Sequence, residues 1–166
     1  MDRLTHFYTG AGGHVIRMST PVGKSDTIQE YLHLHPQGGS KAVGFITVNE
    51  YGEPKGAQGV RRQVGDLFVD PEHRGSGVSS GLWDVASHDN PDIGELHHSP
   101  ERTEAGERFA QRVSGDRPDL IPPRHSIRGV HAQRLAEREY PFMLKSLNQD
   151  LFHELARMDT SGGYDD

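Results

Sequence analysis

The chain has 166 residues and a formal net charge of −6 with histidine neutral, which suits a single domain of ordinary size and argues against nucleic-acid binding through a concentrated positive field. It contains no cysteine, so disulfides, thiolate zinc sites and cysteine nucleophiles are excluded. No stretch approaches the ~20 apolar residues of a membrane span, and no apolar region follows Met1. We therefore expect neither a membrane span nor a secretion signal.

The first part of the chain predicts strands joined by glycine-rich turns. Within residues 1–20 we expect a short strand, a turn at the glycines of residues 10–13 and a second strand at 14–20. Residues 25–36 begin like a short helix, and their second half alternates like a strand. Residues 41–50 are rich in β-branched and aromatic side chains, which is typical of a strand.

The next predicted strand covers residues 64–70 and is apolar on both faces. Simple alternation places Leu67 and Val69 on one face. It places Val64 and Phe68 on the other face. Such a strand is typical of a position in the middle of a sheet that is covered on both sides.

Helices dominate the second half. We expect a helix at residues 76–87, a loop, a short strand at 95–99 and a helix at 101–115. Gly115 is a plausible end for the second of these helices. An extended, proline-rich stretch follows at 116–124.

Residues 125–158 have helical periodicity, and Pro141 predicts a kink or the start of a second helix within them. The last residues, 159–166, predict a loose acidic tail. The helical part carries an apolar stripe at spacings of three and four, formed by Leu144, Leu147, Leu151, Leu155 and Met158. The stripe can pack on the chain's own sheet or on a partner.

The sequence "VDPEHRGSGVSSGLW" (residues 69–83) joins a buried strand to a helix through a corner rich in glycine and serine. Such a corner gathers several unpaired backbone N–H groups at the positive end of the helix dipole. Glycine also lets the backbone approach a ligand closely. The pattern therefore indicates an anion site, most often one for phosphate. It lacks the Gly-Lys-Ser/Thr of a P-loop and the third glycine of a dinucleotide fingerprint.

The stretch "LFVDPEHRGSGVSSGLW" resembles the acetyl-coenzyme A loop of the GNAT N-acetyltransferase superfamily. The usual form is a strand ending in Val-x-Pro, then Arg/Gln-x-x-Gly-x-Gly/Ala, then a helix. The positions that match are Pro71, Arg74, Gly75, Gly77, Val78 and Leu82. Ser79 stands where glycine or alanine is usual. The order of the predicted elements also agrees, and the resemblance covers roughly residues 40–115.

The resemblance implies an α+β fold with a mixed, mostly antiparallel sheet flanked by helices and an appended C-terminal helical segment. We accordingly divide the chain into a GNAT-like core at 1–117, a Pro-rich linker at 118–127, a C-terminal helical extension at 128–158 and a disordered acidic tail at 159–166. The implied activity is transfer of an acetyl group from acetyl-coenzyme A to an unidentified amine.

The implied cofactor-binding residues are Phe68, Val69, Arg74, Gly75, Ser76, Gly77, Val78 and Ser79. Attack of an amine on a thioester needs a base within hydrogen-bond reach. Asp66, on the strand before the loop, is the first candidate, with His73 and His97 as others. The alternative to a catalytic role is that Asp66 is only a solvated strand residue or a turn partner. We expect no metal site, because no helical histidine pair with metal-ligand spacing accompanies the eleven histidines.

Several family features are missing. Many members use a tyrosine on the last core helix to protonate the departing thiolate, and here that position falls on Ala110, or on Gln111 after a shift of one residue. The two N-terminal helices that usually shape the acceptor site have only "SDTIQEY" to represent them. The tail is helical where a strand hairpin is usual.

These departures leave a second interpretation open: a non-catalytic GNAT-like protein that serves in assembly, such as a virion component of a phage. The run "HSPERTEAG" is similar to stretches in small phage proteins, and arginine outnumbers lysine 14 to 4, as in GC-rich genomes. We expect coenzyme A as a partner in the first interpretation. In the second, residues 128–158 contact another copy or an assembly partner. The expected location is the cytoplasm, or the virion in the second interpretation.

Overall fold

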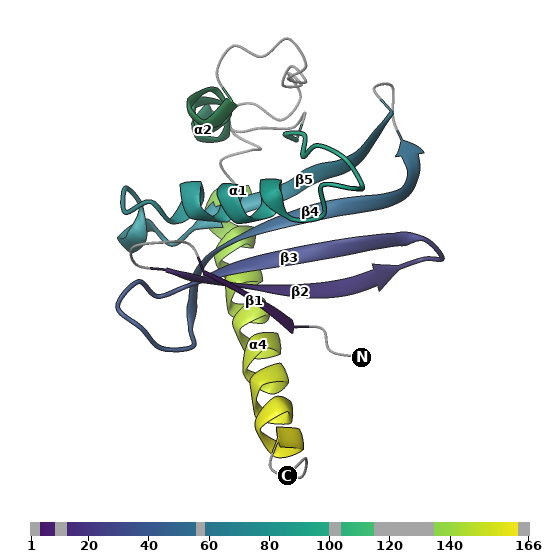
Figure 1. Cartoon of the computed structure of the whole chain (residues 1–166). Coiled ribbons are helices and arrows are strands. Elements are labelled where there is room, and N and C mark those ends of the chain that lie inside the picture. Colours follow the sequence, from purple (N-terminus) through teal and green to yellow (C-terminus); the bar gives the residue numbers. More distant parts are fainter. Residues whose placement is uncertain (1–3, 9–12, 56–58, 100–103, 115–134, 163–166) are drawn as a thin grey trace.

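The computed structural model describes residues 4–8, 13–55, 59–99, 104–114 and 135–162. Its centre is a five-stranded antiparallel sheet in the order β1-β2-β3-β4-β5, so each strand pairs with the next one along the chain (Figure 1). The strands are β1 (Leu4–Tyr8), β2 (His14–Val22), β3 (Asp26–Leu34), β4 (Ala42–Lys55) and β5 (Val60–Val69). The chain is therefore an α+β protein built on a β-meander.

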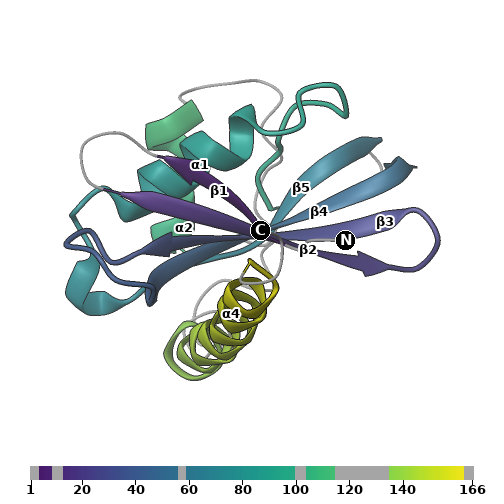
Figure 2. The same ribbon diagram turned by 60° about the horizontal axis from the view of Figure 1, so that its bottom comes forward.

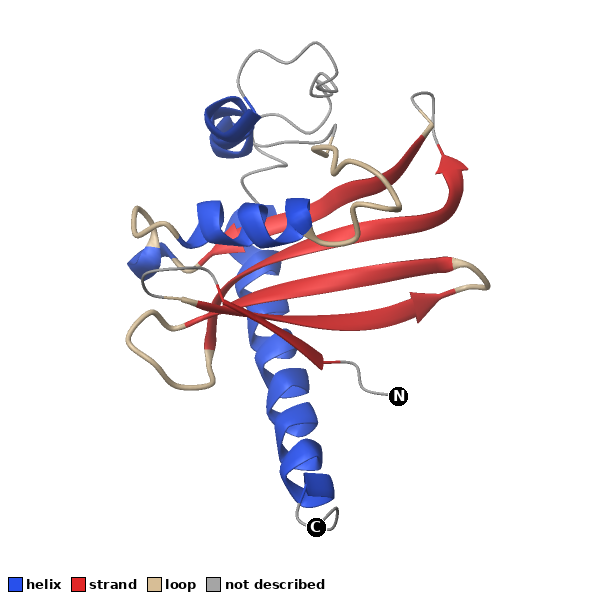
Figure 3. Cartoon of the chain, in the orientation of Figure 1, coloured by secondary structure: helices blue, strands red, loops and turns tan. Residues whose placement is uncertain are grey.

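Three α-helices accompany the sheet in the described residues: α1 (Val78–His88), α2 (Glu104–Ser114) and α4 (Tyr140–Gly162) (Figure 3). A 3₁₀ turn at Pro71–His73 precedes α1, and one π-helical turn at Leu135–Glu139 leads into α4. Pro141 lies in the first turn of α4 and follows the π-helical turn directly, so its missing backbone N–H removes one possible donor where the two helical segments join. The predicted kink or helix start at Pro141 coincides with the change from the π-helical turn to α4.

The sheet lies between α1 on one face and α4 on the other, as Figure 2 shows. The core beneath α1 is formed mainly by Val15, Tyr31, Ile46, Val48, Val64, Val69, Val78, Leu82 and Ala86. The core beneath α4 is formed by Ile16, Met18, Leu32, Phe45, Phe68, Leu144, Leu147 and Leu151, with smaller contributions from neighbours. The leucine stripe of α4 therefore packs on the chain's own sheet, and the C-terminal helix shares a core with the strands.

A β-bulge in β5 corrects the expected facing of that strand. Asp66 is opposite Thr47, and Val64 is opposite Val48, so Gly65 is an extra residue in β5. An extra residue shifts the alternation of side chains by one. Val64 consequently shares the α1 face with Leu67 and Val69. Of these four apolar residues, Phe68 alone lies on the α4 face.

Glycine is needed at the bulge because a Cβ there would lie 2.9 Å from Thr47 Oγ1. Thr47 in turn accepts a hydrogen bond of 2.9 Å from the Asp66 N–H. The threonine hydroxyl thus holds the bulge in place.

Other element boundaries differ from the sequence-based expectation. The expected short helix after residue 25 is wrong: β3 begins at Asp26 and is paired along its length with β2 and with β4. Pairing on both edges outweighs the weak local preference for a helix start. The expected strand at 95–99 is reduced to a single parallel bridge between Gln63 and His97.

At the C-terminus, α4 continues through Gly162, so residues 159–162 of the expected tail are helical. The expected linker at 118–127 and the end of the tail at 163–166 lie outside the described residues.

Candidate functional site

The glycine-rich corner between β5 and α1 has the local geometry that the sequence predicts. Gly75 and Gly77 have φ values of +79° and +86°, a region that side chains with a Cβ rarely enter. A Cβ built on either glycine would meet no atom within 4 Å. The two glycines are therefore needed for the backbone conformation, and the space beside them is open.

The start of α1 leaves its backbone donors unpaired. Gly77 is the N-cap residue and has no side chain to accept a hydrogen bond from the first turn. The first helical bond runs from Gly81 N–H to the Gly77 carbonyl, over 2.9 Å. Within the described part of the chain, the N–H groups of residues 75–80 have no hydrogen-bond acceptor. This run of unpaired donors at a helix N-terminus is suited to an anion.

Beside this corner, the outer edge of β5 is paired over its first half only. The Val64 N–H donates to the His97 carbonyl over 2.9 Å, and the His97 N–H donates to the Arg62 carbonyl over 3.0 Å. Beyond the bulge, the Asp70 N–H donates to Val43 of β4. By the alternation of an antiparallel ladder, the backbone groups of Leu67 and Val69 then point away from β4, toward this outer edge. The second half of β5 thus offers an open edge that leads to the glycine corner.

The segment around residue 97 is held on α1 by aromatic packing. The rings of Trp83 and His98 are stacked, with centroids 4.1 Å apart and planes within 3° of each other. Phe109 of α2 meets Trp83 edge to face at 6.2 Å. These contacts fix α2 and the chain near residue 97 relative to α1, and so they fix where the pairing along β5 ends.

The predicted cofactor residues divide into two groups. Phe68, Val69 and Val78 are buried in the cores, so their side chains are not available at the corner. Arg74 is exposed. Its Nε donates to the Val69 carbonyl over 3.1 Å, and its guanidinium lies 5.8 Å from the centroid of the Phe68 ring. The Ser76 hydroxyl donates to the His73 carbonyl, which closes the turn before α1.

The two predicted catalytic residues have different surroundings. The Asp66 carboxylate accepts a hydrogen bond of 3.4 Å from the Thr47 hydroxyl on the α4 face of the sheet. The His73 ring packs edge-on against His35, with centroids 4.7 Å apart. Both side chains are half-buried. They flank the end of β5 and the corner, but no contact joins them.

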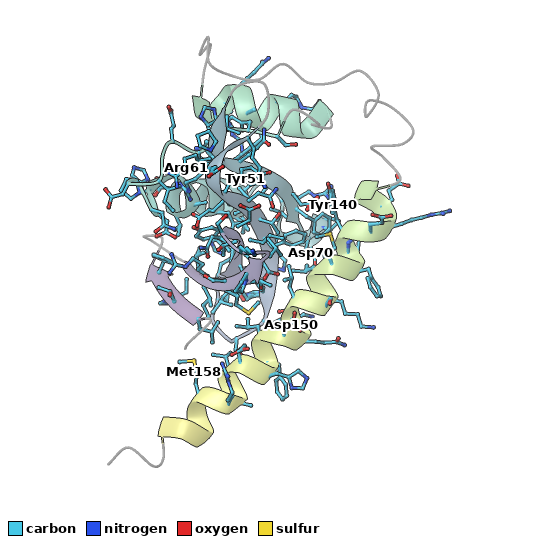
Figure 4. All side chains as sticks on the ribbon, turned by 90° about the vertical axis from the view of Figure 1, so that its right-hand side faces the viewer. Tyr51, Arg61, Asp70, Tyr140, Asp150 and Met158 are labelled. Atoms are coloured by element: carbon cyan, nitrogen blue, oxygen red, sulfur yellow. The ribbon has the colours of Figure 1, made fainter. Side chains whose placement is uncertain are left out.

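An aromatic residue that the sequence did not single out also lies at the end of β5. The Tyr140 ring is 5.9 Å from the Phe68 ring and 6.3 Å from the Phe45 ring. Figure 4 shows Tyr140 between the first turn of α4 and the sheet. Phe68 thus contacts both segments: Tyr140 from the start of α4 and Arg74 from the glycine corner pack on its ring.

A buried polar cluster that sequence analysis missed lies between the sheet and the C-terminal half of α1. Arg62 is fully buried, and it donates from Nε to Glu50 Oε2 over 3.0 Å and from Nη2 to the Ala86 carbonyl over 2.8 Å. Glu50 also accepts hydrogen bonds from the side chains of Gln29 and Asn90. The alternation of Val60, Arg62 and Val64 is the signal that would have placed this arginine on a buried face.

At the end of α1, Asp89 accepts hydrogen bonds from Arg17 and from the Tyr31 hydroxyl, the latter over 2.6 Å. Burial, together with this hydrogen bond to Asp89, raises the pKa of the Tyr31 phenol well above its usual range. These contacts, with those of Arg62, attach α1 to three strands. They set the position of the helix whose first turn forms the glycine corner.

Among the described residues, no group of three or more histidine or carboxylate side chains is arranged to hold a metal ion. The described helices include none with the length and apolar character required to cross a bilayer. Comparisons with protein-family models, with curated proteins and with solved structures found no match to this chain.

Proposed function

We propose that this chain is an acetyl-coenzyme A-dependent N-acetyltransferase of the GNAT type. The observation that carries the proposal is the run of unpaired N–H groups at residues 75–80 beside the open edge of β5. Coenzyme A has a pyrophosphate that suits the helix N-terminus and a pantetheine arm whose amides suit an open strand edge. One ligand thus uses both adjoining sets of backbone groups.

In the proposed reaction, the acceptor amine attacks the thioester carbonyl carbon. A C–N bond forms, the C–S bond breaks, and the products are an amide and the thiol of coenzyme A. Asp66 takes the proton that the amine nitrogen loses, and its hydrogen bond from Thr47 orients the carboxylate. Backbone N–H groups at the end of β5 stabilise the negative charge that develops on the carbonyl oxygen.

The test is calorimetric titration of the protein with coenzyme A and with acetyl-coenzyme A. The variant Gly77→Glu places a carboxylate at the mouth of the corner and should abolish binding by bulk and charge. Gly23→Glu is a matched control: Gly23 has the same φ of +86° and the same open surroundings, but it lies in the turn between β2 and β3. Its backbone strain is therefore equal, and its binding should equal that of the wild type.

Catalysis is tested by the release of free thiol from acetyl-coenzyme A in the presence of a panel of primary amines. Asp66→Asn should bind the cofactor normally and turn over slowly. A wild-type protein that is folded but binds neither form of coenzyme A would overturn the proposal.

We propose a non-catalytic assembly role, for example in a virion, as the second candidate. The observation that favours it is that the expected position of the family's tyrosine acid falls on the fully buried Ala110, or on Gln111 after a shift of one residue, and neither side chain is an acid. The assembly role gains support if the cofactor titration gives no heat and the protein is fully folded.

A further inference from the structure

The described part of the chain leaves four large apolar residues exposed, and three of them lie on α4. These residues are Val22, Phe142, Phe152 and Met158, and only Val22 lies outside α4. Phe142 and Phe152 are 72% and 69% exposed. Contact of two phenylalanine rings with water is unfavourable, and exposed apolar groups of this kind mark sites of contact with another surface.

These phenylalanines belong to a regular row. Counting along α4, five exposed positions follow one another at spacings of three, four, three and four: Phe142, Lys145, Gln149, Phe152 and Ala156. This is the spacing at which one helix packs along another. We call these five residues the outer row. The inward stripe of leucines is already occupied by the sheet, so the outer row is a second, separate helix-packing surface.

We infer that the outer row pairs with the outer row of a second copy of this chain, with the two α4 helices antiparallel. The row is complementary to itself when it is reversed about Gln149. Phe142 then lies opposite the small Ala156, and Lys145 lies within one residue of the position opposite Phe152. The two Gln149 side chains meet at the centre, where each amide donates to the other.

Each of these pairings has a physical basis. A large side chain opposite a small one fills the space between two helices without overlap. A lysine over an aromatic ring contributes cation–π attraction and buries its aliphatic stem. A polar pair at the centre of the row, where each glutamine amide needs a partner, defines the register of two helices.

The charge pattern selects the antiparallel direction. A parallel pair would bring the two Lys145 ammonium groups together and repel. The antiparallel pair separates them and gives each one a ring. The sheets do not obstruct this arrangement, because each lies on one side of its own α4, as Figure 2 shows, and the leucine stripe packs on that side. The dimer is independent of cofactor binding.

The test is the molecular mass of the full chain in solution, by sedimentation equilibrium over a range of protein concentrations. The wild type should be a dimer. Phe152→Lys should weaken the dimer by about tenfold or more, because it removes a buried ring and places a lysine opposite Lys145 of the second copy. Helix content by circular dichroism should be unchanged, because Phe152 is exposed in the single chain.

A charge exchange tests the direction and register. In the double variant Lys145→Glu/Phe152→Lys, each new lysine faces a new glutamate of the other copy only if the helices are antiparallel about Gln149. The double variant should therefore recover the dimer. Within one helix these positions are seven residues apart, on one face but two turns from each other, so recovery arises between copies.

Asp150→Lys is the control, since Asp150 is exposed on the same helix but lies outside the outer row (Figure 4). This variant should remain a dimer. A monomeric wild type at every concentration, or a Phe152→Lys variant that dimerises like the wild type, would overturn the inference. A double variant that stays monomeric would overturn the antiparallel register.

Discussion

The guanidinium of Arg62 and the carboxylate of Glu50 form an ion pair on neighbouring strands, with Nε 3.0 Å from Oε2 and both side chains almost completely removed from solvent. Charges in this position are stable only when each is paired and hydrogen-bonded. Glu50 receives two further donors, whereas Arg62 Nη1 has no hydrogen-bond partner among the described residues. The pair is therefore sensitive to the loss of either member.

Removal of one member of this pair should cost much more than removal of both. Arg62→Met leaves a buried carboxylate without its counter-charge and should lower the free energy of unfolding by about 3–5 kcal/mol. The double variant Arg62→Met/Glu50→Met should be more stable than this single variant, because no buried charge is left unpaired. Urea unfolding followed by circular dichroism measures both values. Additive losses in the double variant would contradict the argument.

Gly44 of β4 allows α1 to approach the sheet closely. A Cβ at this position would lie 2.9 Å from Val78 Cγ1 and 3.0 Å from the Phe68 carbonyl oxygen. Gly44→Ala should therefore destabilise the fold by about 1–3 kcal/mol through overpacking. Val78→Ala removes one of the two clashing groups. The double variant should therefore lose less unfolding free energy than the sum of the losses in the two single variants. A double-mutant cycle by urea unfolding measures this difference.

Docking of α4 on the sheet can be tested with adjacent residues. Leu151 of α4 is fully buried between the helix and the sheet. Leu151→Ala should therefore lower the free energy of unfolding by about 2–5 kcal/mol. Asp150 is exposed, and Asp150→Ala should change it by less than about 0.5 kcal/mol. Equal, small effects at the two positions would mean that α4 does not pack on the sheet in solution.

A second contact secures the same helix. The Asn148 side chain accepts a hydrogen bond of 2.7 Å from the Ala42 N–H and donates one of 3.0 Å to the Ala42 carbonyl. Asn148→Leu has a similar size and removes both bonds at the start of β4. It should destabilise the fold by about 1–3 kcal/mol, because two backbone groups lose their partners. Thermal unfolding at one protein concentration provides the comparison, and a melting temperature at or above that of the wild type would refute this role.

His33 should make the stability depend on pH. The ring is 5% exposed, and burial lowers the pKa of His33 below its ordinary value of 6.5. The unfolded chain therefore takes up a proton at a higher pH than the folded chain does. Stability from this group is fully present above about pH 6.5 and is lost as the pH falls toward the lowered pKa.

This pH dependence is measured as the free energy of unfolding at about pH 7.5 and about pH 5.5. His33→Gln should reduce the difference between the two values. His153→Gln, at an exposed position of α4, should leave the difference unchanged. If the wild type and His33→Gln lose equal stability on acidification, His33 is not the group responsible.

Much of the local structure follows from neighbouring residues. The β-branched and aromatic residues of β4, the glycines of the corner before α1 and the leucine spacing of α4 are all visible in the sequence, and the elements that they predict are present. The positive φ angles of Gly75 and Gly77 are also predictable from the sequence, because a chain that turns from a strand into a helix within a few residues needs them. The GNAT-type activity that the corner suggests remains a proposal.

The tertiary structure decided which surfaces meet. The bulge at Gly65 moved Val64 to the α1 face, and β3 became a strand because β2 and β4 pair with it on both edges. In the sequence, the leucine stripe was compatible with packing on a partner protein or on the chain's own sheet. The structure shows that Leu144, Leu147 and Leu151 pack on the sheet. The partners in each case come from distant parts of the chain. Periodicity in a sequence identifies an apolar face, but the free energy of burial depends on the surface that covers that face, and this surface exists only in the folded chain.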